Sequence, residues 1–302
     1  MLTYLCAVLA ACANAGASVL QRKANRDIPR EEQMSLALVR DLLRSPAWFG
    51  GIAAVTCGFL LQAAALTRGA LAVVEPILVV ELPITVLLAC WAFHGRLGRR
   101  EWLAIGGMTL GLAGLIYVLS PSGGIARAVA WWEWALALGI SGALLAALVS
   151  WGRASDGAAR AGIYGTATGL GFGMTAALTK GMTGALDQGI WHVLAVWQTY
   201  AMVLTGIGSM YLLQNAVNAG RLVAAQPGIT LTDPVVSILW GVLLFGEHVR
   251  GGWYVALAVL GIGLMAASVV ALARSPLLTE SEPAADRAAP EPGRADRARL
   301  GV

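Results

Sequence analysis

Four polar side chains recur on one face of an otherwise apolar segment, Leu222–Phe245, which is long enough to cross a bilayer. They follow one another at helical spacing: Gln226, Thr230, Asp233 and Ser237. A carboxylate near the middle of a membrane-spanning helix costs roughly 3 kcal/mol on insertion. This face must therefore contact protein, water or a substrate rather than lipid. We predict that it binds a proton, a cation or a small solute; the alternative is that its side chains only hold helices together by hydrogen bonds.

An earlier segment, residues 70–93, repeats this pattern and adds Glu75 and Glu81. Both segments contain two prolines at the spacing Pro-x6-Pro: Pro76 and Pro83 in the first, Pro227 and Pro234 in the second. Proline removes a backbone donor and kinks a helix. We therefore expect all four prolines to act as hinges of interrupted helices. Their matching positions indicate an internal duplication of the chain.

The acidic residues of both segments are placed deep in their predicted helices. Glu81 and Asp233 each lie 11 residues from the start of a predicted span, or about 16 Å at 1.5 Å per residue. This is near the middle of a hydrocarbon core of roughly 30 Å. The two acids are not equivalent in the repeat, since Glu81 aligns with Thr232. Lys180 could serve as a counter-ion to a buried acid, but because it lies near the end of its own span it is expected to extend its ammonium to the interface.

Further polar residues of the apolar segments could line the same site. They are Asn14, Thr175, Asn215 and Asn218, beside Asp233, Glu81, Glu75, Gln226, Thr230 and Ser237. The sequence predicts neither a cofactor nor a set of metal ligands.

Composition places the chain among membrane proteins. Hydrophobic residues make up 58% of the 302 residues and charged residues 13%, and the mean hydropathy is +0.70. A soluble protein has about 25% charged residues. Because the basic residues lie in short loops, the sequence pI of about 9.1 does not indicate nucleic-acid binding. The predicted partner is the lipid bilayer.

We predict an all-α fold of nine membrane-spanning helices. Their bounds are 2–20, 47–66, 70–93, 102–119, 128–151, 161–185, 191–214, 222–245 and 253–273. Residues 1–120 form a first repeat of four helices, with a basic interfacial loop at 21–46. A connecting helix at 128–151 leads to a second repeat of four helices at 158–273. The tail, 274–302, is predicted to be disordered, because it is rich in Pro, Ala, Glu and Arg.

Small residues at regular spacing predict close contacts between helices. Gly165, Gly169 and Gly173 recur every four residues, and Gly107 and Gly111 have the same spacing. Such spacing lets two helix backbones approach one another.

Loop charges predict the orientation in a bacterial-type plasma membrane. Of the 21 lysines and arginines, 17 fall on one side if the amino terminus is outside and the carboxyl terminus cytoplasmic. This is the asymmetry of the positive-inside rule. Helices 1–4 and 6–9 then run in opposite senses through the membrane. Inverted repeats with proline-interrupted helices are typical of secondary transporters, whose binding site lies near the midplane between the halves.

Several motifs of residues 1–273 resemble the drug/metabolite transporter superfamily (EamA-like). These are the duplicated helical unit, its two proline-containing helices and the Leu-Phe-Gly-Glu run of Leu244–Glu247. The segments Val19–Lys23 and Ser45–Gly50, with the nine-span count, look more like the NIPA-type magnesium-transporter branch. Many members of the superfamily have ten spans, so this chain departs from that pattern. The resemblance implies alternating access by helices of the two halves around a central cavity.

The sequence therefore favours a secondary transporter of a small solute or cation, with a proton or Mg²⁺ among the candidates. Mg²⁺ keeps most of its water and needs only one or two carboxylates. A membrane enzyme is not expected, because no nucleophile–base cluster or nucleotide motif is present. The alternative of another class is a membrane scaffold or lipid-interacting protein without flux. Substrate, coupling ion and oligomeric state are left open by the sequence.

Overall fold

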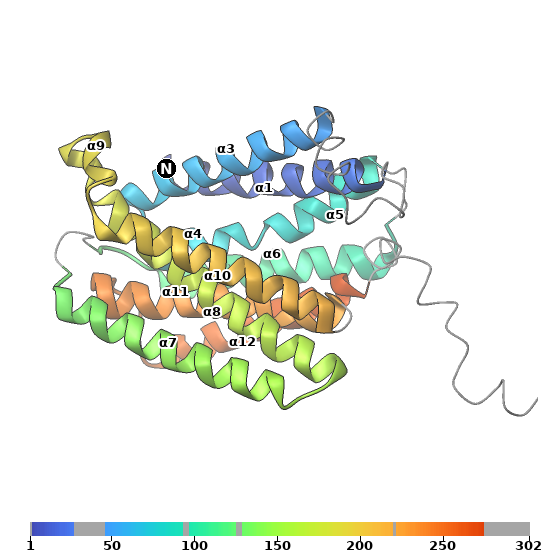
Figure 1. Cartoon of the computed structure of the whole chain (residues 1–302). Coiled ribbons are helices and arrows are strands. Elements are labelled where there is room, and N and C mark those ends of the chain that lie inside the picture. Colours follow the sequence, from blue (N-terminus) through green and yellow to red (C-terminus); the bar gives the residue numbers. More distant parts are fainter. Residues whose placement is uncertain (1, 27–45, 93–96, 125–128, 220–221, 275–302) are drawn as a thin grey trace, which may run out of the picture.

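The computed structural model describes residues 2–26, 46–92, 97–124, 129–219 and 222–274, and they are almost entirely helical. The helices lie lengthwise beside one another, with short connections at the two ends (Figure 1). In chain order they are α1 (Leu2–Arg26), α3 (Pro46–Arg68), α4 (Leu71–Leu78), α5 (Glu81–Ala92), α6 (Arg99–Leu119), α7 (Trp131–Arg153), α8 (Gly157–Thr183), the 3₁₀ turn η3 (Leu186–Gln188), α9 (Ile190–Val193), α10 (Trp197–Ala219), α11 (Leu222–Phe245) and α12 (Trp253–Ala273).

Seven helical segments of the described residues are long and apolar enough to cross a membrane, which makes this a multi-pass membrane protein. Six of them are α1, α3, α6, α7, α11 and α12, and the seventh is formed by α4 and α5 together. The helices α8 and α10 have sufficient length, 27 and 23 residues, but are not among the seven. Glycine and threonine run through α8, and much of that helix is buried against its neighbours.

Glycines of α8 let this helix approach the backbone of α11 closely. A Cβ built on Gly165 would lie 2.3 Å from the carbonyl oxygen of Ala225, and one built on Gly169 would lie 2.8 Å from that of Ile229. The backbone of α11 thus occupies the space that a side chain would need at these two positions of α8. The predicted close contact is confirmed here. It is confirmed again between α6 and α12, where a Cβ on Gly111 would meet the carbonyl oxygen of Gly261 at 2.9 Å.

The pattern of helix packing is similar in the two predicted repeats. In the first, α1 packs against α3 and against both parts of the broken helix, α4 and α5. In the second, α8 packs in the same way against α10 and α11. The last helices of the two repeats, α6 and α12, pack against each other, and α7 packs on α8. Figure 1 shows α8 and α11 near the centre of the bundle, with α1 and α3 along one side and α7 along the other.

The two proline-containing segments differ in structure. The first is interrupted at Val79 and Val80, between α4 and α5. Pro83 explains the position of this break, because its ring has no N–H and clashes with the carbonyl four residues earlier, that of Val79. The second segment, α11, runs unbroken through Pro227 and Pro234. The prediction of an interrupted second helix is therefore wrong, and the close contact with α8 along this length supports α11 in helical form.

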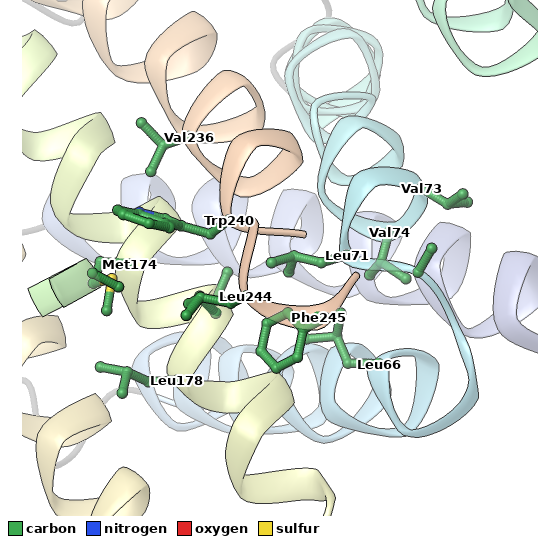
Figure 2. Packing of buried hydrophobic residues seen from close by; sticks show 14 of the residues in the cluster. Leu66, Leu71, Val73, Val74, Met174, Leu178, Val236, Trp240, Leu244 and Phe245 are labelled. Atoms are coloured by element: carbon green, nitrogen blue, oxygen red, sulfur yellow. The ribbon is translucent and has the colours of Figure 1, made fainter. Parts of the chain in front are cut away.

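A cluster of buried apolar side chains lies at the end of the bundle where α4 begins and α8 and α11 end. Figure 2 shows Leu66 and Leu71 of the first half facing Leu244 and Phe245 of the second half. Trp134 of α7 joins this cluster, with its ring edge-on to Phe245 at a centroid distance of 5.9 Å. The two halves of the chain thus share one core at this end.

Some predicted boundaries shift in the structure. The span expected at 191–214 begins only at Trp197, because Ile190–Val193 forms the separate short helix α9. The connecting helix begins at Trp131 and ends at Arg153. The first helix continues to Arg26, into the basic loop expected at 21–46. The rest of that loop up to residue 45, and residues 275–302 of the tail predicted to be disordered, lie outside the described residues.

Candidate functional site

The break between α4 and α5 presents two glutamates to the interior of the bundle. Glu75 lies one turn after the start of α4 and is only 3% exposed. Its Oε1 accepts a hydrogen bond of 2.8 Å from Nε2 of Gln62, on α3. Glu81 is the first residue of α5, directly after the break, and is half-buried. The kinked chain therefore places two carboxyls on different helical segments within a single span.

The partners of Glu81 come from the first helix of the chain. Ser18 of α1 lies 3.5 Å from Oε1 of Glu81 and donates its hydroxyl hydrogen. The side chain of Asn14, one turn earlier on the same helix, also hydrogen-bonds to Glu81. Asn14 is thus brought to the acidic group, as predicted. The hydroxyl of Ser18 belongs to the same polar face of α1, although Ser18 was not among the predicted site residues.

The second half of the chain contributes Asp233. Its Oδ1 accepts a hydrogen bond of 3.4 Å from the hydroxyl of Ser237, a buried residue one turn further along α11. On the same helix, Nε2 of Gln226 donates to Oγ1 of Thr230 over 3.2 Å. The four polar residues predicted to share a face thus form two hydrogen-bonded pairs in succession along α11.

The carboxyls of Glu75, Glu81 and Asp233 lie close enough for their charges to interact. Asp233 is the central member, since it interacts electrostatically with Glu75 and with Glu81. We call these three residues the carboxyl cluster. It joins α4 and α5 of the first half to α11 of the second. The hydrogen-bond donors given by the structure are neutral: the amides of Gln62 and Asn14 and the hydroxyls of Ser18 and Ser237.

The cluster is not a preformed multidentate metal site. Within the described residues, no three Asp, Glu, His or Cys side chains lie close enough together to hold one metal ion between them. One or two of the carboxyls could still contact a cation that keeps its water shell.

Three predicted site residues lie away from the carboxyl cluster. Thr175 of α8 donates to the carbonyl of Gly171 over 2.8 Å and lies 3.1 Å from Oγ1 of Thr205, so it links α8 to α10. The amide of Asn215 donates to the carbonyl of Tyr211, on its own helix, and Asn218 is exposed. Helical periodicity placed these residues on polar faces, but Thr175 faces α10, Asn215 bonds its own helix and Asn218 lies at the surface.

A second buried polar group lies at the amino-terminal end of the bundle, which we define as the end where α1 and α4 begin. Lys180 of α8 forms an ion pair with Glu247, and both side chains are buried, 2% and 0% exposed. Lys180 also donates to the carbonyl oxygen of Gly69 over 3.1 Å. The expectation that Lys180 extends to the membrane interface is therefore wrong. Its ammonium is instead held inside the protein by a carboxylate and a carbonyl.

Glu247 also caps α4. Its Oε1 accepts from the N–H of Leu71 over 2.5 Å, and its Oε2 from the N–H of Ala72 over 2.9 Å. A carboxylate is stabilised at a helix start, where N–H groups lack intrahelical partners. We call Lys180, Glu247 and these first amides of α4 the Lys180–Glu247 junction. Sequence reasoning noticed the Leu-Phe-Gly-Glu run that contains Glu247, but nothing in the sequence indicated either partner.

Comparison with known proteins adds one relative. The chain is 28% identical, over 285 residues, to an uncharacterized protein of Corynebacterium glutamicum, and the alignment covers 91% of this chain and 96% of the relative. No protein-family model matches the chain. No solved structure matches it either.

Proposed function

We propose that this protein is a secondary membrane transporter that moves a small solute or cation by alternating access. The observation that carries the proposal is the carboxyl cluster, in which helices of both halves contribute acids to one buried group. Glu75 and Glu81 come from a broken helix, and Asp233 from the unbroken helix opposite. Ionisable residues inside a membrane bundle are rare and typically belong to ion or substrate pathways.

Electrostatics supports a role in binding positive charge. Ionised carboxyls at Glu75, Glu81 and Asp233 would repel one another, and burial deprives Glu75 and Asp233 of the solvation of water. Protons or a bound cation would remove that repulsion, while an empty, ionised cluster would favour a conformation that admits water. Loading and unloading the cluster would therefore change which end of the bundle is open.

The packing of the helices is consistent with nine spans in an inverted repeat. The contacts of α1 with α3 and with the broken helix have counterparts in the contacts of α8 with α10 and α11. In this proposal α8 and α10 also cross the membrane, and their polar faces are covered by protein. The loop charges then place the amino-terminal end of the bundle outside and the carboxyl terminus in the cytoplasm.

Mg²⁺ transport of the NIPA type is the second candidate, because every charged group of the cluster is acidic. A hydrated Mg²⁺ needs only one or two of the three carboxyls. A membrane scaffold without transport activity is the remaining alternative. Such a protein would not require acidic residues from both halves of the chain to interact inside the bundle. Flux measurements separate these possibilities.

The test uses purified protein in liposomes, with proton flux followed by an internal pH-sensitive dye and Mg²⁺ uptake by an internal Mg²⁺-sensitive dye. Asp233→Asn retains size and hydrogen bonding but removes the charge, and it should reduce flux at least about tenfold. Glu133→Gln is the matched control, since Glu133 accepts from the backbone N–H of Ala130 at the start of α7, away from the cluster. Undiminished flux in Asp233→Asn would refute a role of the cluster, and wild-type protein inert to both ions would favour the scaffold.

A further inference from the structure

The Lys180–Glu247 junction connects the two halves of the protein through charge rather than through apolar packing alone. Lys180 belongs to α8, and Glu247 follows α11, so both are parts of the second half. Their other partners, the carbonyl of Gly69 and the first amides of α4, belong to the first half. Replacing a buried ion pair by apolar residues is often neutral or stabilising. A buried ion pair at this position is therefore poorly explained by stability alone. It is better explained if the contact between the two halves has to open and close.

The segment that covers the junction is attached by three backbone hydrogen bonds, one of which runs from the N–H of Arg250 to the carbonyl oxygen of Leu119 over 2.9 Å. Ser122, after α6, and His248, after α11, exchange two backbone hydrogen bonds of 3.0 and 2.8 Å and form an isolated bridge. Gly124 lies directly over the ion pair, because a Cβ built on it would be 2.7 Å from Cγ of Glu247 and 3.1 Å from Nζ of Lys180. Glycines with positive φ flank the second strand of this bridge, Gly246 at 63° and Gly252 at 68°. Glycine adopts these angles without strain, so both ends of the segment can pivot.

The helix α4 links the junction to the carboxyl cluster over a single turn. Glu247 binds the N–H of Leu71, and Glu75 of the cluster follows one helical turn later. The helix is only eight residues long and is separated from α5 by the break at Val79 and Val80. It is therefore short enough to tilt as a unit, although its seven buried residues also pack against neighbours that include α1, α8 and α11 and must shift against them.

We propose that α4 is a gate helix, closed by the Lys180–Glu247 junction, and that release of the junction opens a path from the amino-terminal end of the bundle to the carboxyl cluster. This inference rests on the proposed transport function, for which it supplies the moving element. The structure is the state closed at this end. Loss of Lys180 as counter-charge weakens the hold on Glu247, and release of Glu247 from the N–H groups of Leu71 and Ala72 frees the first turn of α4. Displacement of α4 then carries Glu75 away from Asp233.

The first measurement follows access to the start of α4. Ala70, the residue before α4, is 6% exposed. In a variant whose four native cysteines are replaced, Ala70→Cys is reacted with a hydrophilic maleimide in lipid nanodiscs, which expose both membrane faces. Addition of Glu247→Gln should raise the labelling rate at least about tenfold, because breaking a buried ion pair removes several kcal/mol. Glu133→Gln, at the same end of the bundle but outside the junction, should leave the rate unchanged.

The second measurement tests the gate by amide hydrogen exchange in a disulfide variant, which keeps both Lys180 and Glu247. Residues opposite each other in a hydrogen-bonded antiparallel pair have Cα atoms about 5.5 Å apart, within the range of a disulfide. The double variant Ser122→Cys/His248→Cys, in the same cysteine-free chain, should slow amide exchange at Leu71 and Ala72 when oxidised. Reduction should restore the exchange rate of the parent chain.

If Glu247→Gln does not fold, the proposal can still be tested, because the disulfide variant keeps Lys180 and Glu247 and its amide exchange can be measured. Exchange at the start of α4 that is equal in the oxidised and reduced forms would overturn the gate, as would unchanged labelling in folded Glu247→Gln. Neither readout depends on flux. A gate that passes both tests in a protein that moves neither protons nor Mg²⁺ would leave the gate standing and refute the proposed ion transport.

Discussion

The contact between α8 and α11 offers a quantitative test of the packing that positions Asp233. In Gly165→Ala the new Cβ would lie 2.3 Å from the carbonyl oxygen of Ala225 and 3.0 Å from its carbonyl carbon. Real Cβ atoms essentially never come within 3.0 Å of another heavy atom, so the helices must separate by more than half an ångström. Overpacking of this kind costs about 1–3 kcal/mol. Because the obstacle is backbone, no side-chain rotation can relieve it.

Gly162→Ala is the control, one turn earlier on the same helix. Its Cβ would meet the carbonyl oxygen of Ala224 at 3.5 Å, an ordinary van der Waals distance. Alanine there should be neutral or stabilising, by up to about 1 kcal/mol, from its higher helix propensity. Thermal unfolding of the purified protein in detergent should therefore give a melting temperature several degrees lower for Gly165→Ala than for Gly162→Ala. Equal melting temperatures would refute the contact of α8 with the backbone of α11.

Three further outcomes follow from the described contacts and the loop charges. Lys180→Met should lower the free energy of unfolding by about 3–5 kcal/mol because it leaves Glu247 buried and uncompensated, and adding Glu247→Gln should recover part of that loss in a double-mutant cycle of thermal unfolding. Gln62→Leu removes the donor to buried Glu75 and should cost about 1–3 kcal/mol in the same assay; a change below 0.5 kcal/mol would contradict the hydrogen bond. A cysteine at Ser122, an exposed residue after α6 at the same end of the bundle, should react with an impermeant reagent outside cells and one at Pro283 should not, and the reverse result would overturn the proposed orientation.

The sequence by itself determined the class of protein and the chemistry of its unusual residues. A charged share of 13% and apolar segments of spanning length can only be reconciled with a bilayer. The glycine spacing of α8 and α6 predicted close helix contacts because helical period and residue size are local properties. Glu75, Glu81 and Asp233 were recognised for the same reason, since the penalty for a carboxyl in an apolar helix does not depend on its partner.

The tertiary structure decided which of these residues meet. The spacing of polar residues predicted a polar face on each of α8, α10 and α11. Of these three faces, only that of α11 reaches the carboxyl cluster, because tertiary packing sets the rotation of each helix about its own axis. Pro83 separates α4 from α5, whereas Pro227 and Pro234 leave α11 unbroken, since the cost of a kink depends on the helices beside it. The ion pair of Lys180 with Glu247 spans 67 residues of sequence. No local pattern encodes that distance, because the free energy that buries the pair arises only when α4, α8 and α11 have come together.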